Sequence, residues 1–557
     1  MLSYRKLAMR VLGRPLHTGG GIDSPRPASQ RAAAFILTAA MLTTFTAPAF
    51  AKTWYIENGD ITISAGKTEG TNKVSQGSTT DEEDTDTVIT NNNRDTASSH
   101  TVTIDAGNDK VEVTLKDVNI KADSGSALTS NGDVTLTLKG ENHLTGGNGD
   151  IYGGDGITSS GSLTISGGTV TATGGNNTGS DGSGGSGIYS VSGSVTISGG
   201  TVNATGGEGS KNNSTSGGSG IYSDSGDVTI SGGTVNANGG NGGTISGGDG
   251  ICSSGGVTIS SGSTVTANGG SGEDGSGGRG ITSNGGVTVS GGTVNAKGGS
   301  GKNGNGGDGI LSFNPVAISG GTVKSNGGSG TISGGDGIRS LDHVAISGGT
   351  VKSNGGSGNL SGGNGIISYD IDLSGSLELT AKAGSPNGKA LSRAGKELDL
   401  NTIKDKLGPG AKVTVTDANG KVNQVSIPRP VEPEEPVIPE ESSSSSDGGS
   451  ATSSAPASPL PGLTVTDKDG QRISYTSTQS GNTLTVCVGR FTASFRISLA
   501  ALRQLRAEGI EAITFQTILC STTLSVDELL TMGGEDAEIV LTHHIRSSTL
   551  TVGGKAV

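Results

Sequence analysis

The sequence predicts an all-β protein: a right-handed parallel β-helix with coils of about 30 residues, followed by a small α+β domain. Three observations lead to this fold class. One phrase, GIYSVSGSVTISGGTVNATGG at residues 187–207, recurs with small changes from Gly156 to about Gly384. Each copy contains short apolar runs that end at glycine. After residue 462 the composition changes to that of an ordinary folded domain.

An isoleucine opens each copy of the repeat and fixes its register. These residues are Ile157, Ile188, Ile221, Ile251, Ile281, Ile310, Ile338 and Ile366. The steps between them are 31, 33, 30, 30, 29, 28 and 28 residues. Self-similarity at such a period indicates stacked structural repeats, each of which covers the core of its neighbours.

Alternation within each copy predicts strands and the residues of the core. Val195 and Ile197 alternate with polar residues, and so do Val202 and Ala204 after the next glycine pair. A period of two bounded by glycine is typical of β-strands, and the runs are too short for helices. We expect these four residues and Ile188 to face the core, with about 4.8 Å between coils. A β-propeller is the weaker alternative, because its blades need about 40 residues.

Composition excludes several classes of function. The 557 residues include 102 glycines and only 3% are aromatic, yet valine and isoleucine keep their columns from copy to copy. Disordered glycine-rich tracts have no reason to keep such columns. A net charge of −13 provides no basic face, so we expect no nucleic-acid partner. Threonine, serine and asparagine fill the outward positions, which predicts a polar surface rich in hydroxyl groups.

The N-terminus has the features of a signal peptide, assigned to residues 1–51. Basic residues from Arg5 to Arg31 precede an apolar run, Ala32 to Phe45, and an A-x-A cleavage site, Ala49 to Ala51. Cleavage there leaves Lys52 as the first residue. An uncleaved anchor is the weaker alternative, because the apolar run is short for a membrane span. We therefore expect a secreted, extracellular or cell-surface protein that is not an integral membrane protein after cleavage.

Residues 52–385 contain the predicted β-helix and its N-terminal cap. The segment TWYIENGDITISA begins the cap, and Trp54 is interpreted as a plug over the open end of the core. Residues 67–99 are polar and partly acidic, which predicts a solvated loop. Alternating runs from His100 onwards predict the first coils of the helix. Atypical end coils of this kind protect a solenoid from an open strand edge.

The remaining segments are a cap, a linker and the α+β domain. Residues 386–427 predict a C-terminal cap with a helix at about Lys389–Leu407, and residues 428–462 predict a proline- and serine-rich linker. Residues 463–557 form the α+β domain. Its expected elements are strands at Leu463–Thr466, Thr483–Val488, Ala512–Phe515 and Ile539–Thr542, and helices at Leu499–Glu508 and Val526–Met532, the second capped by Ser525. Cys487 and Cys520 are candidates for a disulfide in an oxidising compartment.

The sequence offers little support for catalysis. It contains no nucleophile elbow, phosphate loop or His-Glu-x-x-His helix, and we expect no enzyme activity. His543 and His544 are adjacent on a strand, so their rings face opposite sides and cannot share a metal. A degenerate polysaccharide lyase is kept as an alternative. That chemistry needs an arginine or lysine base beside acidic residues, and several basic residues lie on the predicted helix wall.

Calcium is the one cofactor that the sequence raises, and the expectation is that no cofactor is needed. The stretch GGSGEDGSG at residues 269–277 partly matches calcium-binding repeats, but the neighbouring copies lack its aspartate. Four aspartates precede the repeat isoleucine, namely Asp155, Asp249, Asp308 and Asp336. Other residue types interrupt their column, so we interpret them as turn residues.

Outward side chains suggest a carbohydrate-binding surface. Tyr189 and Tyr222 follow the opening isoleucine in consecutive coils, so we expect them to stack outward about 5 Å apart. Asn203 and Asn236 occupy an outward amide row. Binding sites combine apolar and aromatic surface with a few well-placed polar groups, and these four residues are the candidates for binding carbohydrate. The competing interpretation is a tyrosine ladder that only stiffens the wall.

Three segments carry a family resemblance: TWYIENGDITISA, the run HTVTIDAG with VEVTLKDVNI, and the VTISGGTV repeats. Together they resemble secreted bacterial β-helix proteins described as carbohydrate-binding-domain-containing or adhesin-like, over about residues 52–385. The resemblance implies an exposed β-helix that binds polysaccharide or surface glycans without catalysis. Many relatives carry Gly-Ala-Gly-Ile-Gly-Gly where this chain has Gly-Gly-Asp-Gly-Ile, so no functional residue is transferred. A structural spacer that presents residues 463–557 as the binding module is the other alternative.

Overall fold

The computed structural model describes residues 51–211, 213–428, 462–467, 471–473, 475–480, 482–488, 492–517, 521–531, 538–543, 548–552 and 555–556. The predicted signal peptide, apart from Ala51, and most of the predicted linker lie outside these residues. The chain divides into two units, one up to Pro433 and the other from Glu434.

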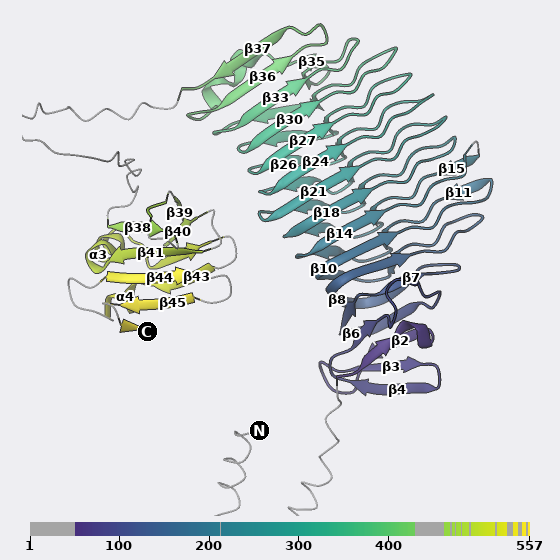
Figure 1. The fold of residues 1–557 in the computed structure, drawn as a ribbon. Helices are drawn as coiled ribbons and strands as arrows, with labels where there is room; N and C mark the ends of the chain where they lie inside the picture. Colours follow the sequence, from purple (N-terminus) through teal and green to yellow (C-terminus); the bar gives the residue numbers. More distant parts are fainter. Residues whose placement is uncertain are drawn as a thin grey trace, which may run out of the picture. The chain divides into compact units, whose positions relative to one another are not determined.

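The first unit is a parallel β-solenoid of about 13 turns, which confirms the predicted fold class (Figure 1). Successive coils pair in parallel, and the pairing follows the sequence repeat. Ile188 lies beside Ile157 in the preceding coil and beside Ile221 in the next. Each regular coil contributes three short strands separated by turns, so the solenoid has three walls.

The first wall holds the strands that begin with the repeat isoleucines: β9 (Ile157–Ser159), β12 (Ile188–Ser190), β16 (Ile221–Ser223), β19 (Ile251–Ser253), β22 (Ile281–Ser283), β25 (Ile310–Ser312), β28 (Ile338–Ser340) and β31 (Ile366–Ser368). It ends with β34 (Leu391–Arg393), which begins with a leucine. The second wall holds β13 (Val195–Ile197), β17 (Val228–Ile230), β20 (Val257–Ile259), β23 (Val287–Val289), β26 (Val316–Ile318), β29 (His343–Ile346) and β32 (Asp370–Leu373). The third wall holds β14 (Thr201–Thr205), β18 (Gly233–Asn238), β21 (Ser263–Asn268), β24 (Thr293–Lys297), β27 (Thr322–Asn326), β30 (Thr350–Asn354), β33 (Glu378–Lys382) and β36 (Lys412–Thr416). One longer strand, β10 (Leu163–Thr173), pairs with both β13 and β14.

The predicted core is confirmed. Ile188, Val195, Ile197, Val202 and Ala204 are all fully buried, and the matching residues of the other coils are buried too. Burying one valine or isoleucine side chain stabilises a fold by about 1.5–3 kcal/mol. Because each coil repeats these burials, the columns account for the stacking of the coils.

An inward column of serines accompanies the apolar columns, and the sequence analysis did not predict it. The third residue of each regular first-wall strand is buried, as Ser190 and Ser223 illustrate. Ser223 Oγ donates to the Gly226 carbonyl oxygen at 2.8 Å, within the turn that follows. Ser312 Oγ is an exception, because it has no hydrogen-bond partner among the described residues. Buried hydroxyls generally need such a partner, and the other serines of the column make this polar repeat position structural.

An N-terminal cap precedes the regular coils. It contains β1 (Thr53–Tyr55), a 3-10 turn at Ile56–Asn58, β2 (Ile61–Ala65), β3 (Asn72–Gln76), β4 (Thr79–Asp84) and β5 (Val88–Thr90). The first long strands follow as β6 (Val102–Lys116), β7 (Asn119–Lys121) and β8 (Leu128–Thr145). Trp54 is buried, as expected of a plug, and its Nε1 donates to Asp84 Oδ2 at 2.8 Å.

The prediction of a loop over residues 67–99 is wrong, because β3, β4 and β5 lie there. β3 pairs antiparallel with β2 and β4, and β5 pairs in parallel with β1 and β6. The acidic run becomes a strand because its carboxylates have partners. Asp84 is buried and accepts a hydrogen bond from the Lys52 backbone N–H at 3.1 Å, and Glu82 pairs with the Lys52 ammonium at 2.6 Å.

Stacked loops project from one edge of the solenoid (Figure 1). We call them the fin, residues 146–154, 174–185, 206–218, 239–248, 269–278, 298–307, 327–335 and 355–363. Glycine backbones bond directly to one another, both between and within loops. Gly207 N donates to Gly185 O of the preceding loop at 2.7 Å, and Gly218 N donates to Gly207 O of the same loop at 2.9 Å. Two short strands, β11 (Asp181–Ser183) and β15 (Ser214–Ser216), pair at the outer end of the fin.

The helix predicted at Lys389–Leu407 is not formed. β34 pairs in parallel with β31 and extends the first wall, and β35 (Lys396–Glu397) turns back antiparallel to it. A 3-10 helix, η2 (Leu400–Lys406), follows and is capped by the Asp399 side chain. The unpaired edge of the last coil supplies backbone partners for a strand, and this tertiary contact overrides local helix propensity. Strand β37 (Val422–Ser426) pairs with β36 and ends the described part of this unit.

The second unit is an α+β domain, as predicted. One sheet contains β38 (Leu463–Thr466), β41 (Ala493–Ser498), β44 (Glu538–His543), β45 (Ser548–Val552) and β46 (Lys555–Ala556), and the other contains β39 (Thr476–Ser480), β40 (Thr483–Cys487), β42 (Ala512–Gln516) and β43 (Ser521–Ser525). The two helices are α3 (Leu499–Ala507) and α4 (Val526–Thr531). Ser525 Oγ accepts a hydrogen bond from Glu528 N at 3.4 Å, which agrees with its predicted capping role.

Within the described ranges, no helix is long and apolar enough to cross a membrane.

Candidate functional site

The two candidate tyrosines stack on the first wall. Tyr189 and Tyr222 occupy equivalent positions of β12 and β16, with ring centroids 5.2 Å apart and planes inclined by 14°. This geometry agrees with the expected spacing. Both side chains are half-buried. Stacking along the solenoid axis uses the ring face that each tyrosine turns towards the other, so edges and hydroxyl groups remain for a ligand.

The hydroxyl groups of the two tyrosines differ. Tyr222 Oη donates to Asp224 Oδ1 at 2.6 Å, and burial, followed by this hydrogen bond, raises the Tyr222 pKa above its usual range. Burial also raises the pKa of Tyr189. Its hydroxyl makes no hydrogen bond to any residue that the structure describes. Both rings therefore stay uncharged at neutral pH, and the Tyr189 hydroxyl is available to a ligand.

The two candidate asparagines lie on a different wall. Asn203 in β14 and Asn236 in β18 are in register, and Asn236 Nδ2 donates to Asn203 Oδ1 at 2.8 Å. The third wall leads into the fin, whose loops return to the first wall. The structure thus forms a tyrosine row and an amide row, but it does not bring the two rows together in one site.

The first wall carries further apolar residues that the sequence analysis missed. Phe313, Leu341 and Tyr369 follow β25, β28 and β31, and all three are exposed. Each stands three residues after its repeat isoleucine, where the earlier copies have Val191, Asp224, Ser254 and Asn284. The constant offset of three residues from the repeat isoleucine could have identified this position from the sequence.

The turn aspartates link one coil to the next. Each accepts a hydrogen bond through Oδ1 from a backbone N–H of the following coil, as in Asp155 with Ser186 at 2.6 Å and Asp308 with Asp336 at 2.7 Å. This agrees with their interpretation as turn residues. Among the described residues, no group of three or more histidine, cysteine, aspartate or glutamate side chains is placed to hold a metal ion.

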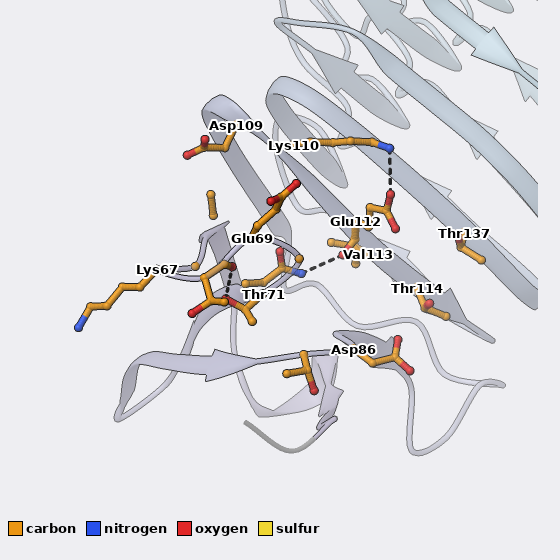
Figure 2. Close-up of a pocket in the computed structure, with 16 residues that line it drawn as sticks. Lys67, Glu69, Thr71, Asp86, Asp109, Lys110, Glu112, Val113, Thr114 and Thr137 are labelled. Carbon is orange, nitrogen blue, oxygen red and sulfur yellow. Dashed lines mark hydrogen bonds and ion pairs between the residues drawn. The ribbon is translucent and has the colours of Figure 1, made fainter. Parts of the chain in front are cut away.

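A polar groove of about 860 Å³ lies between the N-terminal cap and the first long strands (Figure 2). None of the candidate residues lines it. Lys67, Glu69 and Asp86 contribute from the cap, and Lys110 and Glu112 contribute from β6. Lys110 Nζ and Glu112 Oε1 are 2.9 Å apart, joined by the dashed line in Figure 2.

The lyase alternative requires a lysine or arginine base beside carboxylates. The protonation state of Lys110 therefore decides whether it can act as that base. Its hydrogen bond to Glu112 and the charge of that carboxylate raise the Lys110 pKa above its ordinary value. A general base works best with a pKa near the operating pH, and this shift keeps the ammonium protonated. Lys110 is therefore poorly suited to act as a general base.

Among the described residues of the second unit, His543 is a buried histidine. His543 is fully buried, its Nε2 lies 2.9 Å from Thr522 Oγ1, and burial lowers its pKa. The neighbouring His544 lies outside the described residues. Cys487 Sγ donates to Gln516 Oε1 at 3.5 Å, and Cys520 is also outside the described residues, so the disulfide stays a prediction.

Comparison of the chain with family models, curated proteins and solved structures finds no match.

Proposed function

We propose that this protein is a secreted, non-catalytic β-helix that binds polysaccharide or surface glycans, in the manner of an adhesin. The observation that carries the proposal is the first wall, where two consecutive coils present an aromatic ring and a hydroxyl group at the same position. Tyr189 and Tyr222 stack there 5.2 Å apart. A sugar polymer also repeats its hydroxyl groups at regular intervals, and a repetitive protein surface can contact several units at once.

Hydrogen-bonding chemistry supports the same proposal. The Tyr189 hydroxyl and the carboxylate of Asp224 next to Tyr222 are a donor and an acceptor on the wall surface. The adjacent second wall presents threonines, including Thr196 and Thr229, which are half-buried. Sugar hydroxyls both donate and accept, so they match this mixture of groups.

A glycan array probed with the full-length protein tests the proposal. The double variant Tyr189→Ala/Tyr222→Ala should weaken binding to the captured glycans by roughly tenfold or more, since aromatic anchors dominate binding surfaces. Tyr152→Ala is the matched control, because Tyr152 is an exposed tyrosine in the fin.

Two results would contradict the proposal. The first is that no glycan is captured by the full-length protein. The second is that binding is unchanged in the double variant but lost when residues 463–557 are removed. That outcome would assign the second unit as the binding module and the solenoid as a spacer.

A further inference from the structure

Three consecutive coils near the C-terminal end of the solenoid expose a row of apolar side chains. Phe313, Leu341 and Tyr369 have 48%, 39% and 73% of their surface exposed. Phe313 N donates to Ser283 O and Leu341 N donates to Ser312 O, each at 2.9 Å, so this turn stacks from coil to coil. Tyr369 follows β31 in the next coil, in a turn one residue shorter, because Ile338 pairs with Ile366 whereas His343 pairs with Asp370. Phe313 and Leu341 are therefore one coil step of about 4.8 Å apart along the solenoid axis, and Tyr369 extends the row in the next coil.

Arg339 connects this row to a neighbouring cavity. On the first wall it is in register with Leu311 on one side and Ile367 on the other. Its guanidinium also lines a cavity of about 280 Å³, where its Nη1 lies 3.8 Å from Asp336 Oδ2. Leu341 follows β28 (Ile338–Ser340), whereas Asp336 precedes it. The apolar row and the cavity thus lie at opposite ends of this three-residue strand, with Arg339 between them.

The cavity contains two cations and two carboxylates. Arg279 and Arg339 line it together with Asp308 and Asp336, which are 8% and 7% exposed. Asp308 uses Oδ1 to accept from Asp336 N, and its Oδ2 has no hydrogen-bond partner among the described residues. The volume of the cavity, about 280 Å³, is near the small end of the range of roughly 300–1,000 Å³ for small-molecule sites. It has room for one sugar unit rather than for a folded partner.

These groups define the chemistry of a ligand. Guanidinium groups only donate hydrogen bonds and carboxylates only accept them, so together they match a molecule whose hydroxyls do both. The formal charges of the four side chains cancel, which favours an uncharged ligand over a uronate or an amine. The exposed aromatic and aliphatic row matches the C–H face of a pyranose ring.

We propose that Arg279, Asp308, Asp336 and Arg339, with the row Phe313, Leu341 and Tyr369, form a second glycan subsite that binds a neutral pyranose polysaccharide. The polymer lies along the solenoid axis on the apolar row, and the cavity, at the other end of the first-wall strands, holds one further sugar. The inference rests on the proposed glycan-binding function and names both a new site and the class of its ligand.

The test is affinity electrophoresis of the full-length protein in gels containing xylan, mixed-linkage β-glucan or polygalacturonate. The variant Phe313→Ala/Tyr369→Ala should reduce retardation by a neutral polymer, with affinity lower by roughly tenfold or more. Arg339→Gln should reduce it as well. The matched control is Tyr152→Ala/Leu360→Ala, because these fin residues are 71% and 73% exposed and lie outside both proposed sites.

Each outcome separates this inference from the proposed function. Loss of neutral-polymer binding in Phe313→Ala/Tyr369→Ala but not in the control supports the subsite. If Tyr189→Ala/Tyr222→Ala abolishes retardation while Phe313→Ala/Tyr369→Ala leaves it unchanged, glycan binding stands and the second subsite is refuted. Retardation by polygalacturonate alone would refute the neutral-ligand class. If the wild-type protein is retarded by none of the polymers, the inference fails, and the glycan array then decides the proposed function separately.

Discussion

At the scale of single residues, the carboxylates of the turn aspartates connect neighbouring coils by accepting hydrogen bonds from backbone N–H groups. Asp308 is the clearest case. Its carboxylate accepts the backbone N–H of Asp336, while burial first, and the charge of Asp336 second, raise its pKa to about 6 from an ordinary value of 3.8. The folded protein therefore holds this proton more tightly than the unfolded chain does.

This linkage gives the direction of a pH effect. Between pH 3.8 and about 6 the folded state binds more protons at Asp308, so the stability that this group contributes is lost as pH rises through that window. Asp308→Asn keeps an Oδ1 acceptor and removes the charge. It should raise the melting temperature at pH 7.5, by an amount equivalent to at most about 2–3 kcal/mol, and have little effect at pH 3.5.

Thermal denaturation at both pH values measures the effect. Asp123→Asn is the control, because Asp123 is exposed and its substitution changes the net charge equally. A lower melting temperature for Asp308→Asn at pH 7.5 would show that the folded protein needs the Asp308 charge.

At the scale of elements, the fin is held by contacts between glycine backbones. Gly207 N donates to Gly185 O and Gly207 O accepts from Gly218 N, at 2.7 and 2.9 Å. A Cβ atom built on Gly207 overlaps the Gly175 carbonyl oxygen. The glycine pairs of the repeat are therefore needed for close packing of backbones, which no residue with a side chain allows.

Gly207→Ala should destabilise the solenoid by about 1–3 kcal/mol or more, because the added methyl group forces backbones apart. Gly199→Ala provides the comparison, since a Cβ atom at Gly199 has no neighbour within 4 Å. Chemical denaturation of the two variants measures the difference, and hydrogen exchange of residues 174–218 should report opening of the fin in Gly207→Ala alone. Equal stability of the two variants would contradict the backbone-packing explanation.

At the scale of the whole molecule, the predicted removal of the signal peptide bears on the stability of the N-terminal cap. Lys52 N lies 3.1 Å from Asp84 Oδ1, and Asp84 is fully buried. No ion pair joins Asp84 to another residue of the described part of the chain. If cleavage leaves Lys52 as the first residue, the new α-ammonium group stands beside this carboxylate and replaces a neutral amide donor.

A protein that begins at Lys52 should be more stable than one that keeps Ala51, by about 1.5–3 kcal/mol, the strength of a hydrogen bond to a charged group. The difference should shrink at pH 10, because an α-amino group loses its proton above roughly pH 8. Melting temperatures of the two proteins measure it. When both proteins also carry Asp84→Asn, their melting temperatures should be equal. A difference that persists in this background would rule out the proposed ion pair.

The repeat by itself determined the fold class, the register of the coils and the core. These properties depend on local alternation and on a constant period, and Ile188, Val195, Ile197, Val202 and Ala204 are buried as the pattern predicted. The spacing of Tyr189 and Tyr222 followed from the same register. In the second unit, the four predicted strands and the two helices also followed from local patterns, but the sequence analysis did not predict β39, β41, β43, β45 and β46.

Only the tertiary structure decided which outward residues meet. It separated Asn203 from Tyr189 by placing them on different walls, and it joined Arg339 to Asp308 and Asp336 around one cavity. It also turned the acidic run into a strand and the predicted cap helix into a continuation of the first wall. Contacts between distant segments made several of these decisions: Asp84 with Lys52, Asp308 with Asp336, and β34 with β31. The order of residues within a single copy of the repeat does not specify such contacts.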